Sequence, residues 1–143
     1  MKLFTLFGFI LSIILFGCSS DDDNEDIIDY STALIGRWEI VQILENDQPI
    51  TITSCQPNTI EFQADGTVTF VEYTASPNCV AMSSGSDTYT IEANVIEIFY
   101  SDNGNTPNGF TEVFTILEID EEALSLVGNE NGTTLRIDYR KIN

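Results

Sequence analysis

From residue 36 to residue 142 the chain alternates short apolar runs with polar turn clusters. The runs are rich in Val, Ile, Thr, Tyr and Phe, and none shows a convincing helical period. Runs of this kind, bounded by Gly, Asn, Asp and Pro, are typical of β-strands. We therefore predict an all-β domain with eight strands, at residues 37–44, 59–63, 67–74, 87–92, 95–100, 110–119, 123–127 and 133–142.

The connections between these strands are mostly short. Asp65-Gly66 and Asn131-Gly132 tolerate the positive φ of tight hairpin turns. Strands joined in this way favour an eight-stranded antiparallel up-and-down meander barrel, because closure removes the exposed edges of an open sheet. A β-sandwich is the alternative, but it usually needs longer crossover connections. In the first strand, regular alternation places Trp38, Ile40, Gln42 and Leu44 on one face.

The first 17 residues predict a signal peptide. Lys2 precedes an apolar run from Leu3 to Phe16, which is shorter than the roughly 20 residues that a transmembrane helix needs. The residues Leu15-Phe16-Gly17-Cys18 resemble a lipobox, in which signal peptidase II cleaves before a lipidated cysteine. This resemblance implies that Cys18 becomes the lipidated first residue of a mature lipoprotein. The alternative is an ordinary secretory signal with a cysteine close to the cleavage site.

An acidic run, Asp21-Asp22-Asp23-Asn24-Glu25-Asp26, follows Cys18. A block of like charges predicts a disordered and extended tether. The run also resembles the export signal of Bacteroidota surface lipoproteins, which implies a protein anchored by lipid in the outer membrane and exposed at the cell surface. The expected domains are a signal peptide at 1–17, the lipidated cysteine and tether at 18–32, and a barrel domain at 33–143.

Charge and cysteine content narrow the classes of partner. The chain has 5 Lys and Arg against 23 Asp and Glu, which gives a formal charge of −18. Nucleic-acid binding is therefore excluded, because contacts to phosphate groups require Lys and Arg side chains. Once Cys18 carries lipid, Cys55 and Cys79 remain as one pair, which predicts a disulfide in an exported protein. The chain contains no histidine, which argues against a metal site and against a cysteine nucleophile.

Candidate catalytic groups are restricted to carboxylates. Glu72, Glu97, Glu112 and Glu118 lie within predicted strands, and an inward pair would suit a glycosidase. We expect all four to face outward. The loop Ser101–Gly109 is interpreted as a polar turn, because it lacks the acidic spacing of a calcium loop. We predict a protein that is not an enzyme and has no catalytic residues, no cofactor and no metal.

The residues Leu34-Ile35-Gly36-Arg37-Trp38, which open the first strand, resemble the Gly-x-Trp start of lipocalins and of lipocalin-like lipoproteins from Bacteroidota. The resemblance extends over about residues 33 to 142. It implies that Gly36 lets the chain close the barrel floor and that Trp38 packs across the base. It also implies that Arg140, near the end of the last strand, lies over the indole of Trp38 in a cation–π contact.

This lipocalin-like resemblance implies a non-catalytic protein that binds a small apolar or amphipathic ligand. The pocket is expected at the open end, near the Cys55 and Cys79 loops and Ser101–Gly109. The alternative is a protein-interaction module, an accessory subunit or inhibitor of another surface protein. Its interior would be filled by Trp38, Ile40, Phe62, Phe70, Tyr89, Phe99, Phe114 and Leu126. Cavity volume separates these two hypotheses.

Overall fold

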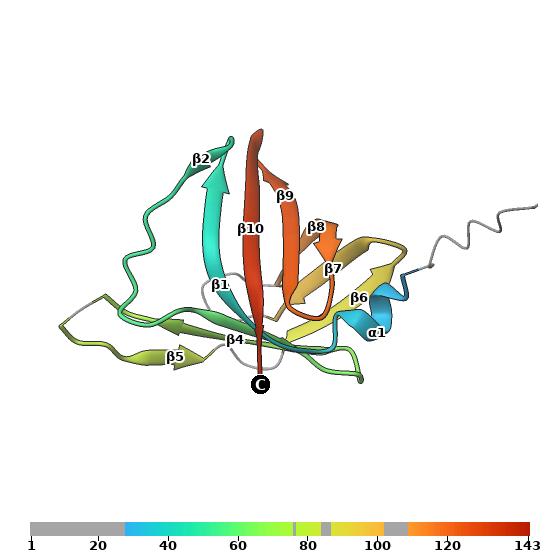
Figure 1. Cartoon of the computed structure of the whole chain (residues 1–143), viewed down its shortest axis with the longest axis horizontal. Coiled ribbons are helices and arrows are strands. Elements are labelled where there is room, and N and C mark those ends of the chain that lie inside the picture. The colour runs from blue at the N-terminus through green and yellow to red at the C-terminus, as the bar shows by residue number, and fades with distance from the viewer. Residues whose placement is uncertain (1–27, 76, 84–86, 102–108) are drawn as a thin grey trace, which may run out of the picture.

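The computed structural model describes residues 28–75, 77–83, 87–101 and 109–143 (Figure 1). The predicted signal peptide, Cys18 and the acidic run lie outside these residues. In chain order the described elements are α1 (Tyr30–Ala33), β1 (Gly36–Glu45), β2 (Gln48–Pro49), β3 (Thr59–Phe62), β4 (Thr67–Tyr73), β5 (Ala81–Ser83), β6 (Asp87–Glu92), β7 (Val95–Tyr100), β8 (Phe110–Ile119), β9 (Ala123–Glu130) and β10 (Thr133–Ile142).

The long strands form a closed barrel. They pair antiparallel in the order β1-β3-β4-β6-β7-β8-β9-β10, and β10 pairs with β1 to complete the ring. Apart from the two short strands β2 and β5, neighbours in the ring are also neighbours in the sequence. The predicted eight-stranded up-and-down meander barrel is therefore confirmed, and the sandwich is excluded.

The two short strands extend the ends of longer ones. β2 pairs with the last residues of β1 through a turn at Asn46 and Asp47, whose φ angles are 49° and 64°. This turn was not predicted, although Asn and Asp are residue types that adopt positive φ in tight hairpins. β5 pairs with the second half of β4. β9 continues to Glu130, three residues beyond the predicted end.

A short helix precedes the barrel. The Asp29 carboxylate caps α1 by accepting hydrogen bonds from the backbone N–H of Ser31 (3.1 Å) and the hydroxyl of Thr32 (2.7 Å). Tyr30 and Ala33 then pack against the barrel core. An Asp at this position satisfies N–H groups that a helix leaves unpaired. The folded part therefore begins a few residues before the expected boundary at residue 33.

The base of the barrel, formed by Leu34, Trp38, Phe62 and Tyr89, is filled. Leu34 and Trp38 are fully buried, and the Trp38 indole N–H donates to the carbonyl oxygen of Leu34 at 2.9 Å. Phe62 and Tyr89 meet edge to face, with ring centroids 5.0 Å apart. A buried indole N–H without a partner would cost stability, so the Leu34 carbonyl is what allows Trp38 to lie here.

The cation over Trp38 is Lys141 and not Arg140. Lys141 Nζ lies 4.7 Å from the indole centroid, whereas Arg140 forms an ion pair with Glu39. The reason is strand alternation: Tyr139 faces inward, so Arg140 faces outward and Lys141 returns to the inner face, directly opposite Trp38 in the β1–β10 register. The prediction for Arg140 was wrong by one residue.

Gly36 leaves room for the Lys141 side chain. Its φ is +133°, and a Cβ built at this position would lie 2.9 Å from Lys141 Cε. A larger residue would therefore be strained in its backbone and would also displace the lysine from the indole. Gly36 thus acts together with Lys141 and Trp38 at the base.

A β-bulge at Val41 changes the inner face of β1. Ile40 pairs with Tyr139 and Gln42 pairs with Asp138, so Val41 has no partner of its own and is half exposed. The extra residue shifts the alternation, and Ile43 now pairs with Ile137. The prediction that Gln42 and Leu44 share a face with Trp38 and Ile40 was therefore wrong.

We predict that Trp38→Ala lowers the free energy of unfolding by about 3 to 5 kcal/mol, because it leaves a large void in the filled base. The measurement is urea unfolding followed by far-ultraviolet circular dichroism, since Trp38 is the single tryptophan. Val41→Ala, at the half-exposed bulge, is the control and should cost about 0.5 kcal/mol or less. Equal unfolding midpoints for the two variants would contradict this account of the base.

Candidate ligand-binding cavity

The barrel wall opens between β4 and β6. These strands pair only at Thr67 with Thr88 and at Val68 with Asp87. Beyond this point β4 pairs with β5 instead, and the β4–β5 hairpin extends away from the remaining strands (Figure 1). The inner side chains at the end of β4 therefore border the opening.

In an up-and-down barrel, alternate connections lie at the same end. Cys55 and Cys79, the residues Ser101 and Gly109 at the two ends of the next loop, and the Asn131-Gly132 turn all lie opposite the base. We call this end the mouth. Residues 102–108 of the loop lie outside the described residues, but the residues on either side of it are described.

A cavity of about 1070 Å³ lies between the base and the mouth. Small-molecule pockets typically measure about 300 to 1,000 Å³, so the space is large enough for an organic ligand. Its apolar walls come from every side of the barrel, including Ile40, Ile60, Ile98, Phe114, Leu126 and Ile137. Tyr100 and Phe110, on either side of the loop Ser101–Gly109, also line it, as do Glu72 and Met82 near the disulfide.

The filled interior considered from the sequence is found only at the base. Trp38, Phe62 and Tyr89 fill that end, whereas Ile40, Phe70, Phe114 and Leu126 line the cavity. Phe99 does not belong to the interior: it is 45% exposed and alternates with the inward residues of β7. The filled interior of the alternative hypothesis is therefore not found in the mouth half.

Glycine at position 128 shapes one wall of the cavity. A Cβ at Gly128 would lie 3.0 Å from two ring atoms of Phe114, its partner in the β8–β9 register. The missing side chain leaves space that the Phe114 ring occupies. Any larger residue would displace this ring.

Three aromatic rings stack in the mouth half of the cavity. The Phe70 and Tyr100 rings have centroids 5.5 Å apart, and the Tyr100 and Phe110 rings are 4.5 Å apart with an interplanar angle of 13°. Stacked rings provide flat apolar faces that favour planar or extended apolar groups. Because the rings come from β4, β7 and β8, the stack bridges the side of the barrel where β4 and β6 separate.

Two tyrosines and a glutamate add polarity to this apolar space. The Tyr100 hydroxyl donates to Glu112 Oε2 at 2.9 Å. Tyr139 also lines the cavity and is only 6% exposed, and its hydroxyl has no hydrogen-bond partner among the described residues. Burial, together with the nearby Glu112, raises the pKa of both tyrosines above the usual range. Both phenols therefore remain neutral donors at physiological pH.

The strand glutamates divide between the two faces of the wall. Glu72 and Glu112 line the cavity, whereas Glu97 and Glu118 are exposed on the outside. Glu130, at the end of β9, also lines the cavity. No Lys or Arg is among the described residues that line the cavity. The expectation that all four face outward was wrong for Glu72 and Glu112. Each lies two residues from an inward phenylalanine, Phe70 or Phe114, and this spacing was the signal in the sequence.

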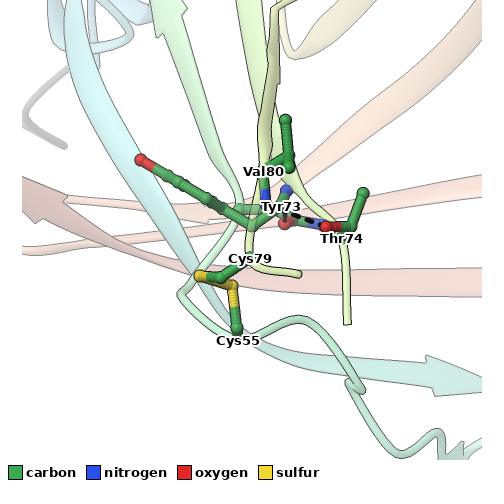
Figure 2. Close-up of a disulfide and its surroundings, with 6 residues drawn as sticks. Cys55, Tyr73, Thr74, Cys79 and Val80 are labelled. Atoms are coloured by element: carbon green, nitrogen blue, oxygen red, sulfur yellow. Dashed lines mark hydrogen bonds between the residues drawn. A yellow bond between two sulfur atoms is a disulfide. The ribbon is translucent and has the colours of Figure 1, made fainter. Parts of the chain in front are cut away.

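The Cys55–Cys79 disulfide joins two connections at the mouth. Its Cα atoms are 5.6 Å apart. Figure 2 shows the bond beside Thr74 and Val80, which follow β4 and precede β5. The Thr74 hydroxyl accepts from Val80 N–H at 2.9 Å, and Cys55 N–H donates to the Thr74 carbonyl oxygen at 3.2 Å. The predicted disulfide therefore holds the long β2–β3 connection against the β4–β5 hairpin.

The described residues offer neither a cluster of metal-binding side chains nor a membrane-spanning helix. No group of three or more His, Cys, Asp or Glu side chains in the described ranges could hold a metal ion. No helix in this part of the chain is long and apolar enough to cross a membrane.

Comparison with known proteins identifies the family. The family model described as a lipocalin-like domain matches residues 34–126, and the chain belongs to this family, which is generally non-catalytic. A lipocalin-like protein from Bacteroides uniformis has a similar crystal structure, with a TM-score of 0.59 and 17% identity over 77% of this chain and 99% of that chain. An uncharacterized protein from Bacteroides eggerthii has a TM-score of 0.57 and 14% identity over 76% of this chain and 99% of that chain. No curated protein matches the chain.

The raised pKa values of Tyr100 and Tyr139 predict that the protein loses stability at alkaline pH. Their pKa values are raised from 10.0, so above about pH 10 the unfolded chain releases phenol protons that the folded chain retains. This contribution to the free energy of unfolding is complete below the unfolded pKa and is lost as the pH rises towards the folded values.

The measurement is the urea midpoint from about pH 9 to about pH 11, for the wild type and for the Tyr100→Phe/Tyr139→Phe variant. The variant should lose less stability over this range, because phenylalanine does not titrate. Absorbance of the folded wild type in the ultraviolet provides the check. Ionisation of all five tyrosines with a midpoint near 10 would contradict the prediction.

Proposed function

We propose that this protein is a non-catalytic, lipid-anchored binding protein of the outer membrane that holds a small apolar or amphipathic ligand in its barrel. The observation that carries the proposal is the cavity of about 1070 Å³ between the filled base and the mouth. The cavity combines apolar and polar lining residues, and an apolar or amphipathic ligand would be stabilised by removing the apolar part of this lining from water.

The shape of the wall favours a ligand that enters at the mouth. The base is filled by Trp38 and its neighbours, whereas β4 and β6 separate after two residue pairs. The disulfide ties the two connections next to that opening, which keeps the entrance formed while the ligand exchanges. Membership of the lipocalin-like domain family is compatible with binding of a small hydrophobic molecule.

A protein-interaction module is the second candidate. It would use the exposed apolar residues of the outer wall, among them Val41, Phe99 and Leu117. The open cavity favours ligand binding over this alternative, since a module that acts only through its outer surface has no need of an unfilled interior.

We also propose that the protein is exported and held at the cell surface by lipid on Cys18. The proposal rests on the apolar leader, the lipobox-like residues that end in Cys18 and the acidic run that follows. A lipoprotein carries more than one acyl chain, and two chains suffice for stable membrane anchoring. The charged tether would then lift the barrel away from the membrane surface.

We predict that native mass spectrometry of the full-length protein, purified gently from its own host, reveals a bound molecule of defined mass. Ile137→Trp, which places an indole in the cavity, should abolish the adduct. Val41→Trp is the matched control on the outer wall and should retain it. Circular dichroism confirms that both variants fold. A wild-type protein that carries no adduct would favour the interaction module and a search for surface partners.

We predict that Cys18→Ser prevents incorporation of labelled palmitate and releases the protein from the membrane fraction of its host. Ser19→Ala, at the next position, should leave both unchanged. Replacement of Asp21, Asp22 and Asp23 by alanine should preserve lipidation but reduce digestion by protease added to intact cells. Labelling that persists in Cys18→Ser would show that this cysteine is not the lipidation site.

A further inference from the structure

We infer that the cavity binds a cationic amphipathic ligand, with an ammonium group at Glu112 and Tyr139 and an aromatic or apolar body along the stacked rings. This inference rests on the proposed binding function, and it specifies the chemical class of the ligand. Three independent features of the cavity support it: an unused carboxylate oxygen, a cavity-lining tyrosine hydroxyl without a hydrogen-bond partner among the described residues, and the absence of any cation among the described lining residues.

Glu112 is held in place but retains binding capacity. Its Oε2 accepts the Tyr100 hydroxyl proton at 2.9 Å, and no ion pair or second hydrogen bond involves its side chain among the described residues. A carboxylate accepts several hydrogen bonds, so Oε1 remains available to a donor in the cavity. An ammonium group would supply that donor together with the opposite charge, and charge-assisted hydrogen bonds are stronger than neutral ones.

Tyr139 provides a second polar group that lacks a partner. It is 6% exposed, lines the cavity, and its hydroxyl forms no hydrogen bond within the described part of the chain. A phenol that lines a cavity can donate a hydrogen bond to a ligand or to water. Burial, and secondarily the charge of Glu112, raise the pKa of Tyr139, and both side chains line the same cavity. A single ligand head group with several N–H donors could therefore reach both residues.

The charge of the cavity selects against anionic head groups. Glu72, Glu112 and Glu130 line it, while the four described basic residues, Arg37, Arg136, Arg140 and Lys141, lie elsewhere. A carboxylate or phosphate head group would be left without a counter-ion beside the half-buried Glu112 and the exposed Glu72 and Glu130, and like charges repel one another. The formal charge of −18 on the whole chain also attracts cations towards the protein.

The stack of the Phe70, Tyr100 and Phe110 rings would contact the aromatic or apolar body of the ligand. Tyr100 belongs both to the stack with Phe110 and to the hydrogen bond with Glu112, so the flat apolar faces begin at the polar site. A cation next to these rings gains a further attraction to their π faces. In the described residues the carboxylates form no group suited to a metal ion, so an organic cation fits this arrangement better.

The test uses three naphthalene probes with the same body and different head groups: naphthylmethylamine, naphthalenemethanol and naphthoate. Isothermal titration calorimetry is performed at neutral pH on the full-length protein in detergent, after removal of any endogenous ligand. We expect the amine to bind about tenfold more tightly than the alcohol, and naphthoate to bind most weakly, because only the amine pairs with Glu112.

Glu112→Gln and Glu97→Gln form a matched pair of variants. Both remove one negative charge, but only Glu112 faces the cavity. Glu112→Gln should reduce the amine-to-alcohol affinity ratio from about tenfold to near one, whereas Glu97→Gln should leave the ratio unchanged. Tyr139→Phe should reduce the ratio about threefold, since it removes one neutral hydrogen bond and preserves the ring.

The outcomes separate this inference from the proposed function. Equal binding of amine and alcohol, or equal ratios in the two glutamine variants, would overturn the cationic ligand and leave the binding function intact. Tightest binding of naphthoate would overturn it as well. If none of the three probes binds, the inference fails, and the native mass spectrum of the wild type decides the binding function independently.

Discussion

Closure of the sheet through β1 and β10 is the constraint on which the rest of this structure depends. The two strands pair from Arg37 with Ile142 to Glu45 with Leu135, so each long strand of the barrel has a neighbour on both sides. Closure gives every strand one inner and one outer face. It also brings Trp38 opposite Lys141, which combines the filled base with the seam that closes the ring.

The two ends of the barrel differ in how far side chains fill the interior, and this difference arises from side-chain size and strand pairing. At the base, large side chains fill the interior, and the only indole N–H reaches a carbonyl oxygen. Towards the mouth, β4 leaves β6 after two residue pairs and the wall widens. The Val41 bulge bends β1 on another side of the barrel. The space that results has both apolar and polar lining residues and is open at one end, which is the form of a binding site.

The polar side chains inside this space differ from the apolar side chains that usually form a protein core. Glu112 and Tyr139 occupy inward positions that line the cavity, and the Tyr139 hydroxyl forms no hydrogen bond with a described residue. Local departures from otherwise consistent core packing are typical of functional sites, where stability is sacrificed for binding. The filled base and the disulfide lie at opposite ends and offset this cost.

The sequence by itself determined the strands, the hairpin turns, the eight-stranded meander and the Cys55–Cys79 pair. These follow from alternation, from turn residues such as Asp65-Gly66, and from counting cysteines under the hypothesis of export, all of which are visible locally. Only the tertiary structure decided that Lys141 replaces Arg140 over Trp38, that Glu72 and Glu112 face inward, and that the mouth half is hollow. Those outcomes depend on which face of each strand turns inward. Spacing along one strand indicates which side chains share a face, but only the pairing of distant strands decides that this face is the inner one.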